Sequence, residues 1–144
     1  MKKKLSIFDC LCHNLRKTSR LLTQYYDEAL RPVGLRITQF TLMATVDEMR
    51  EVAFIPLADF LGMDRTTLAR NVEILLRDGL VSVETGATDR RQQVVRLTEF
   101  GESQLAAAMP LWRAAQRDAM KKAGEWEPLL EQLTELGKVG VPDA

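Results

Sequence analysis

Residues 57–97 of this chain, LADFLGMDRTTLARNVEILLRDGLVSVETGATDRRQQVVRL, decide its fold. The pattern predicts a short helix, a turn at Gly62 and a second helix over about 65–77. Asp64 is placed to cap this second helix, and Gly79 to end it in a left-handed conformation. Two β-rich runs, 81–84 and 94–97, follow and are joined by a glycine-containing turn. This is the order of a helix-turn-helix with a β-hairpin wing. Such a unit offers DNA a helix for the major groove and a basic hairpin for the backbone or minor groove.

Amphipathic segments are predicted on both sides of this unit. Residues 5–31 carry apolar side chains at three- and four-residue steps, and Thr38 can cap the helix that follows. Residues 51–56 (EVAFIP) are expected to be extended, as a short third strand. Thr98 can cap a long helix that Gly124 ends, before a last leucine-rich helix. The expected fold class is therefore mainly α with a small β-hairpin.

The length of 144 residues fits a single domain over residues 1–144. Within it we expect a winged-helix DNA-binding lobe at about 38–98 and dimerisation helices at about 5–31 and 99–137. The terminal helices carry more apolar residues than a core of this size needs, among them Trp112. Two-fold dimers are the commonest oligomers, so we expect a homodimer through these helices.

The composition, 46% apolar and 28% charged, is that of an ordinary globular protein. No apolar run approaches the ~20 residues that span a bilayer, so no membrane segment is expected. Two cysteines and no signal-peptide pattern favour a cytoplasmic protein. The zero net charge predicts modest non-specific affinity for DNA. The chain has no glycine-rich phosphate loop and no nucleophile–base arrangement, so neither an enzyme nor a cofactor is expected.

The helix at 65–77 carries the side chains expected to contact bases in the major groove. Arginine can bond guanine through two hydrogen bonds, and threonine can bond a base edge or meet a thymine methyl group. The candidates are Arg65, Thr66, Thr67, Arg70 and Asn71. The opposite, packed face is expected to consist of Leu68, Val72, Leu75 and Leu76.

The turn of the hairpin carries Asp89, Arg90 and Arg91. A narrow minor groove concentrates negative potential, which favours a guanidinium group. We therefore expect Arg91 to enter the minor groove or to bind its phosphates, and Arg90 to contact phosphate.

Three blocks resemble the MarR family of winged helix-turn-helix regulators over about Leu11 to Gly101. They are LRPVGLRITQFTLMATV, LADFLGMDRTTLARNVEILLRDGLV and TDRRQQVVRLTEFG. The most specific match is Asp89-x-Arg91 followed by Leu97-Thr98-x-x-Gly101. The resemblance implies an obligate dimer, palindromic operators in double-stranded DNA, and usually repression that small aromatic or phenolic compounds relieve.

The resemblance also implies roles for individual residues. In the family's wing motif the aspartate fixes the arginine fork by a short salt bridge, which would here join Asp89 to Arg91. A ligand pocket is implied between the dimer helices and the DNA-binding lobe, and Arg16, Arg20 and Tyr26 would face it.

The segment LCHNLRKTSRLLTQYY resembles the first helix of the organic hydroperoxide regulators, a redox branch of the family. Their reactive cysteine matches Cys12, and one of its tyrosine partners matches Tyr26, whereas the second tyrosine position is Ile37. A thiol-based oxidant sensor is therefore an alternative, with Cys10 as a candidate resolving thiol. The other interpretation is that Cys12 is a buried cysteine of the helix that behaves as a small apolar residue.

Two further alternatives follow from single features. Cys10 and His13 lie three residues apart and could share a metal ion, but no third ligand accompanies them, so no metal site is expected. The zero net charge would suit an interaction module that has kept the winged fold and lost DNA binding. The arginine set Arg65, Arg70 and Arg91 argues against that module.

Overall fold

The computed structural model describes residues 5–139, in which the chain is mainly helical with one small sheet, as predicted. The bounds of the elements are η1 Ile7–Asp9, α1 Leu11–Leu30, η2 Arg31–Val33, α2 Ile37–Met49, β1 Val52–Ala53, α3 Phe54–Leu61, α4 Arg65–Arg77, β2 Val81–Thr85, β3 Gln93–Leu97, α5 Glu99–Ala123 and α6 Trp126–Gly137.

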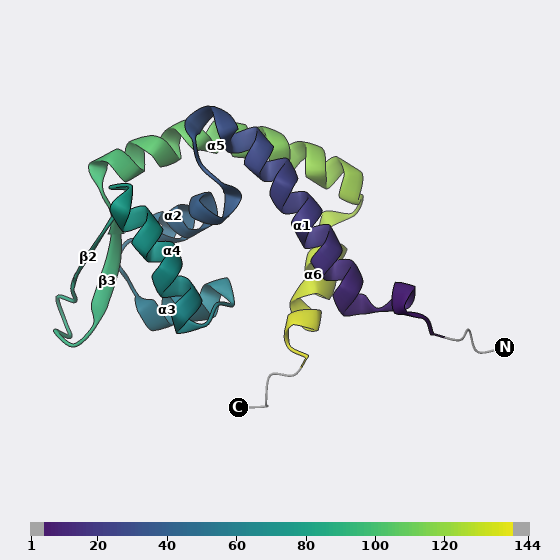
Figure 1. The fold of residues 1–144 in the computed structure, drawn as a ribbon, viewed down its shortest axis with the longest axis horizontal. Helices are drawn as coiled ribbons and strands as arrows, with labels where there is room; N and C mark the ends of the chain where they lie inside the picture. The colour runs from purple at the N-terminus through teal and green to yellow at the C-terminus, as the bar shows by residue number, and fades with distance from the viewer. Residues whose placement is uncertain (1–4, 140–144) are drawn as a thin grey trace.

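Figure 1 shows that the elements form an arch. Helix α5 spans its top, with α2, α3, α4 and the sheet in one limb and α1 and α6 in the other. We call the first limb the winged lobe. The hydroxyl of Tyr26 on α1 donates to Oε1 of Gln116 on α5 at 2.5 Å, and Tyr25 donates to the Ala115 carbonyl at 3.4 Å. No helix within residues 5–139 is both long enough and apolar enough to cross a membrane.

The sheet is antiparallel, with the strand order β1-β3-β2. Val95 of β3 pairs with Val52 of β1 on one side and with Val83 of β2 on the other. The short third strand expected within residues 51–56 is therefore present. Strands β2 and β3 form the predicted wing.

The core of the winged lobe fixes the orientation of α4. Leu68, Val72 and Leu75 are buried in it, as the helical spacing predicts. Leu76 is 42% exposed, so its placement on the packed face was wrong. Each residue rotates a helix by about 100°, and this rotation carries Leu76 away from the buried line.

The predicted caps of α4 and α5 are confirmed, because both depend on residues next to the helix start. Asp64 accepts the N–H of Thr67 at 2.8 Å, and Thr98 accepts that of Gly101 at 3.0 Å. At the other end of α4, Gly79 has the expected left-handed conformation, with φ 71°.

The predicted cap of α2 was wrong. Helix α2 begins at Ile37, before Thr38, and Arg36 at the N-cap position makes no side-chain cap. The carboxylate of Asp27 on α1 accepts the Ile37 N–H at 2.7 Å. The side chain of Gln39 accepts the Arg36 N–H at 2.9 Å. An acceptor from another helix has therefore replaced the local one.

The expected continuous helix over 5–31 is interrupted near its start. Ser6 and Asp9 form a capping box around η1, and Cys10 is extended, with ψ 116°, before α1 begins. The side-chain amide of Asn14 donates to the carbonyls of Phe8 and Cys10, at 2.8 and 2.9 Å, and stabilises this break. Cys10 therefore precedes α1, whereas Cys12 lies in its first turn.

Candidate nucleic-acid interface

The start of α4 is rigid and presents cations to the solvent. Both oxygens of Asp64 accept hydrogen bonds from Thr67, one from its N–H at 2.8 Å and one from its hydroxyl at 3.0 Å. These bonds lower the pKa of Asp64, chiefly through the backbone N–H. Arg65, Thr66 and Arg70 are exposed beside this cap. Because the opposite face of α4 is locked in the core, these side chains face away from the lobe.

Two of the five candidates on α4 already have partners in the chain. The Thr67 hydroxyl is bound to Asp64, and the side-chain amide of Asn71 donates to the Thr67 carbonyl at 2.9 Å. Asn71 is also only partly exposed. Arg65, Thr66 and Arg70 are therefore the side chains of this set best placed to contact bases.

The tip of the wing is ordered by its backbone. Asp89 Oδ1 accepts the backbone N–H of Arg91 at 3.0 Å, and the Gly86 N–H donates to the Gln92 carbonyl at 2.8 Å. The salt bridge expected between Asp89 and the Arg91 fork is not the contact that forms. An aspartate readily bonds the N–H two residues later, and this bond shapes the turn while the guanidinium group stays exposed.

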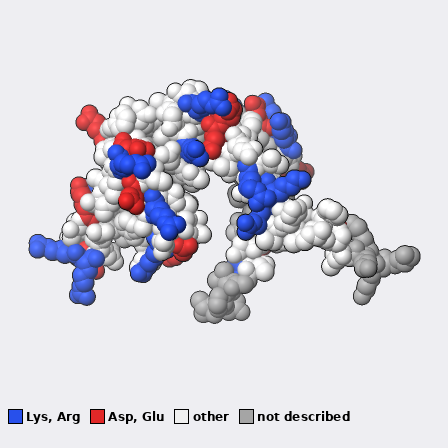
Figure 2. All heavy atoms as spheres, in the orientation of Figure 1, with Lys and Arg blue, Asp and Glu red and all other residues white. Residues whose placement is uncertain are grey.

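Helix α4 and the wing both line one groove of about 470 Å³. Arg65 of α4 and Arg91 of the wing both line it, and Phe54, Ile55 and Pro56 form much of its apolar lining. The structure therefore brings together arginines that lie 26 positions apart in the sequence. Figure 2 shows cationic side chains projecting from the tip of the wing.

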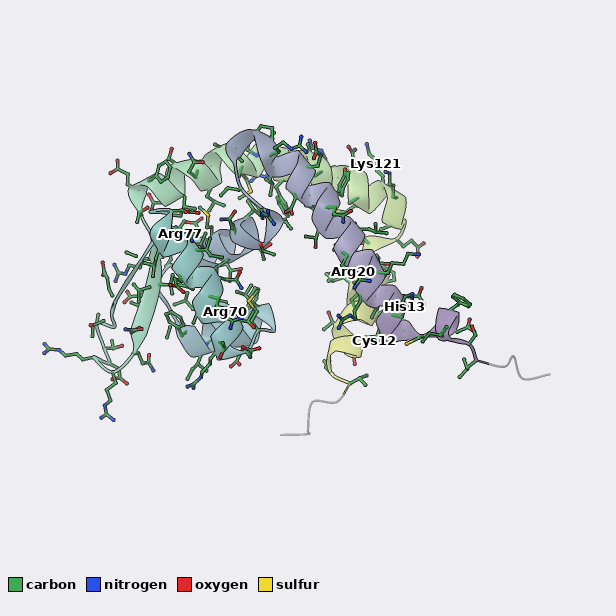
Figure 3. All side chains as sticks on the ribbon, viewed as in Figure 1. Cys12, His13, Arg20, Arg70, Arg77 and Lys121 are labelled. Atoms are coloured by element: carbon green, nitrogen blue, oxygen red, sulfur yellow. The ribbon has the colours of Figure 1, made fainter. Side chains whose placement is uncertain are left out.

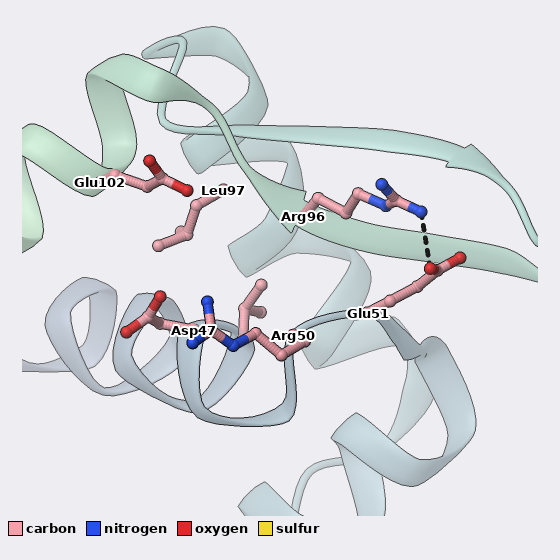
Figure 4. Close-up of a pocket in the computed structure, with 7 residues that line it drawn as sticks. Asp47, Arg50, Glu51, Arg96, Leu97 and Glu102 are labelled. Atoms are coloured by element: carbon pink, nitrogen blue, oxygen red, sulfur yellow. Dashed lines mark hydrogen bonds and ion pairs between the residues drawn. The ribbon is translucent and has the colours of Figure 1, made fainter.

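Arg96, at the base of the wing, is engaged within the lobe. Its guanidinium group lies 2.6 Å from Glu51 and 3.9 Å from Glu84, so it joins the segment before β1 to β3 and β2 (Figure 4). The hydrogen bond and charge of Glu51 raise the pKa of Arg96 further above its ordinary value. Only the pairing of β1 with β3 brings Arg96 to Glu51, so the sequence alone does not identify this partner.

The turn at Arg50, directly before Glu51, has a strained backbone. Arg50 has φ 66° and ψ −77°, and the Glu51 N–H donates to the Met49 carbonyl at 2.9 Å. This is the geometry of a γ-turn with positive φ, which is rare and strained. The Glu51–Arg96 pair therefore sits on a backbone conformation that the surrounding lobe must hold in place.

The remaining candidates lie away from α4. Figure 3 places Cys12 and His13 at the start of α1, in the other limb of the arch from Arg70. Cys12 is exposed in the single chain, so the interpretation of it as a buried residue was wrong, whereas Cys10 is partly buried. Within residues 5–139 no three metal-binding side chains cluster. Arg16 and Arg20 are exposed on α1, whereas partial burial and the neighbouring Tyr25 raise the pKa of Tyr26.

An apolar groove of about 320 Å³ lies between α2, α3 and α5. The rings of Phe40 and Trp112 stack beside it with centroids 5.4 Å apart. Its lining includes Phe60, Met109 and Met49, and sequence analysis named none of these as pocket residues. Their apolar character fits a core equally well, so only the packing of the three helices separates the two roles.

Comparisons with known proteins agree with this geometry. A sequence model of the MarR family matches residues 35–92. The transcriptional regulator MosR of M. tuberculosis, in complex with DNA, is 40% identical over 90% of this chain and 95% of its own, with a TM-score of 0.83.

Two more distant structures share the fold. A point mutant of MarR from E. coli, complexed with operator DNA, is 20% identical over 92% of this chain and 94% of its own, with a TM-score of 0.75. Overoxidized AbfR bound to DNA is 26% identical over 88% of this chain and 91% of its own, with a TM-score of 0.68.

Proposed function

This chain belongs to the MarR family of DNA-binding transcriptional regulators, and from that premise we propose that it is a dimeric repressor released from its operator by a small apolar ligand. The observation that carries the DNA-binding mode is the shared groove of Arg65 and Arg91, beside a helix whose other face is locked in the core. A regulator of this class acts on DNA, so we place it in the cytoplasm and assign it no catalytic activity.

In the proposed mode, α4 lies in the major groove. Arg65, Thr66 and Arg70 contact base edges, and Arg91 contacts the minor groove or its phosphates, with Arg90 beside it on phosphate. Arg96 ties β3 to Glu51 and to β2, and Leu68 and Leu75 of α4 are buried in the same core as Val95 of β3. The lobe therefore presents both contacts as one unit.

The test begins with selection of the operator from random duplex DNA. Arg70→Ala should then relax base preference, at a cost of roughly 1–3 kcal/mol on the selected site. Arg91→Ala should weaken binding to selected and scrambled duplexes alike and lower the salt slope by about one phosphate contact. If both variants bind as wild type does, with an unchanged slope, the proposed docking is wrong.

The dimer is proposed from exposed apolar side chains on η1, α1 and α6. They are Ile7, Phe8, Leu11, Leu15, Leu21, Leu22, Leu130 and Leu133, between 38% and 82% exposed. Several large apolar side chains exposed on one limb typically mark an interaction site. A two-fold dimer through these helices would place two lobes on one duplex, so the operator should be a palindrome.

The effector site is proposed at the apolar groove beside Phe40 and Trp112. Aromatic walls and few polar groups suit a planar aromatic compound. Because α5 and α2 both line the groove, a ligand there would change the angle between the winged lobe and α5. The groove beside Phe40 and Trp112 is tested by tryptophan fluorescence: salicylate should quench the fluorescence of wild type, and Phe40→Ala should lose this quenching.

Arg16, Arg20 and Tyr26 do not line this groove. A ligand site at these three residues on α1 is a separate proposal.

A second candidate function rests on Cys12. Its thiol is exposed. The relative AbfR has been solved in an overoxidized form, although that form is bound to DNA. In this alternative, oxidation of Cys12, with Cys10 as partner thiol, would release DNA. Near-stoichiometric organic hydroperoxide should then release wild type and spare Cys12→Ser. If the hydroperoxide affects wild type and Cys12→Ser equally, the thiol-based alternative is wrong and the repressor controlled by a ligand stays the proposal.

A further inference from the structure

Helix α4 has a groove along each flank. Its buried line runs through Leu68, Val72 and Leu75. At about 100° per residue, Arg65 and Ala69 lie on one side of the exposed face, and Asn71, Ile74 and Asp78 lie near the other. The groove shared with the wing is lined from the first side. A second groove, of about 450 Å³, is lined by Asn71, Ile74 and Asp78.

The second groove brings together arginines from two helices. Arg36, at the start of α2, and Arg77, at the end of α4, both line it (Figure 3 labels Arg77). Both are exposed, and Thr38, Gln39 and Asn71 add polar groups to the lining. The backbone N–H of Arg36 donates to the side chain of Gln39, which fixes the backbone from which the Arg36 side chain extends.

The shape of the DNA major groove places a phosphate backbone beside this second groove of the protein. The major groove is about 12 Å wide and an α-helix with its side chains is about 10–12 Å across, so an inserted helix has a phosphate backbone along each flank. In the proposed docking, the wing meets one of these two backbones. We propose that Arg36 and Arg77 bind phosphates of the opposite backbone, as a second clamp. This inference rests on the proposed insertion of α4 into the major groove.

Asp78 opposes this role to a limited extent. Its carboxylate lies 3.7 Å from Nε of Arg77, and the two side chains are 44% and 74% exposed. Exposed pairs of this kind are weak, so a phosphate can compete for the guanidinium group. The groove keeps an excess of positive charge, because Arg36 and Arg77 face one acid among its lining residues.

The experiment measures affinity against salt for the full-length chain. The probes are a short labelled duplex carrying the selected operator and the same duplex scrambled. Arg36→Gln and Arg77→Gln should each weaken binding to both probes by about two- to fivefold. Each should also lower the slope of log K against log salt by about 0.9, with base preference unchanged. Asp78→Asn should act in the opposite direction and tighten both complexes.

Two controls separate a contact from a general effect. Arg31→Gln removes the same charge five residues before Arg36, from a side chain that pairs with Glu28 outside the groove, and should leave the slope as in wild type. Arg36→Lys keeps the charge and should restore the slope, which a folding defect at the start of α2 would not allow.

The outcomes distinguish this inference from the proposed function. If Arg91→Ala lowers the slope while Arg36→Gln, Arg77→Gln and Asp78→Asn leave it unchanged, the second clamp is wrong and the docking of α4 and the wing stands. If neither Arg70→Ala nor Arg91→Ala alters binding to the operator, the proposed docking fails and the clamp fails with it.

Discussion

The winged lobe and the limb formed by α1 and α6 differ in how their apolar side chains are covered. In the lobe, Met43, Val46, Leu57, Leu68 and Leu75 are completely buried. In the other limb, Leu30 is the one buried residue of α1, and within the described chain α6 has none. The lobe therefore has its own core, whereas the helical limb has the character of one side of a subunit interface.

The difference matters energetically. Burying a large apolar side chain contributes about 1.5–3 kcal/mol, and the exposed leucines of α1 and α6 forgo this contribution in a single chain. A second copy would recover it. From this comparison we expect the lobe to fold without assembly, and the stability of α6 to depend on the proposed partner.

The largest expected effect separates two neighbouring leucines of the lobe. Leu75→Ala should reduce the free energy of unfolding by about 2–5 kcal/mol, because it leaves a cavity at a completely buried site. Leu76→Ala, at a 42% exposed site, should change it far less. Urea denaturation of both variants measures the contrast. Similar losses in the two would mean that the lobe lacks the separate core described above.

The next effect tests the helical limb. Leu130→Glu on α6 should disrupt the proposed dimer, because a carboxylate would enter an apolar interface. Sedimentation should then give 16.3 kDa instead of twice that mass, and operator affinity should fall about a hundredfold as the two half-sites lose their linkage. Leu130→Met keeps the apolar character and should remain dimeric. A wild-type monomer that binds its operator tightly would contradict the proposal.

A third effect lies where the two limbs join. A Cβ atom at Gly101 would stand 1.9 Å from the Leu80 carbonyl oxygen, so α5 passes the lobe at a distance that only glycine allows. Gly101→Ala should cost about 1–3 kcal/mol by overpacking. Gly137→Ala on α6 meets no atom within 4 Å and should be neutral or slightly stabilising. Thermal unfolding of the pair compares them directly.

The smallest effect concerns the cap of α4. Hydrogen bonds from Thr67 lower the pKa of Asp64 below the ordinary value of an aspartate. A carboxyl with a lowered folded pKa stabilises the native state above its unfolded pKa and loses this contribution as pH falls through the folded value. Asp64→Asn keeps an acceptor at the cap without the titration. The stability difference between wild type and Asp64→Asn should therefore shrink below about pH 4, and a constant difference would contradict this.

Local signals predicted most of the lobe. Asp64, Gly79 and Thr98 act through neighbours three or fewer residues away, so their sequence positions sufficed. Apolar spacing likewise placed Leu68 and Leu75 in the core. The order of helix, turn, helix and hairpin then followed, and with it the resemblance to the family.

Interactions between distant segments were harder to predict. The cap of α2 comes from Asp27, ten residues before the bond it accepts, so Thr38 was chosen wrongly. Arg96 finds Glu51 only through the pairing of β1 with β3. Asp89 had two acceptable partners, the backbone and the fork of Arg91, and spacing could not choose between them. The grooves beside α4 could not be predicted, because each is lined by residues from separate elements that no sequence motif connects.

The length of α5 has a consequence for the spacing of the operator. Its 25 residues make a rod of about 37 Å, which runs from the winged lobe toward the proposed interface. At that radius a rotation of about 5° at the interface moves the lobe by about 3 Å, close to the 3.4 Å rise of one base pair. We therefore expect the packing of α1 on α5, including the contacts of Tyr25 and Tyr26, to limit how many base pairs can be added or removed between half-sites before binding is lost.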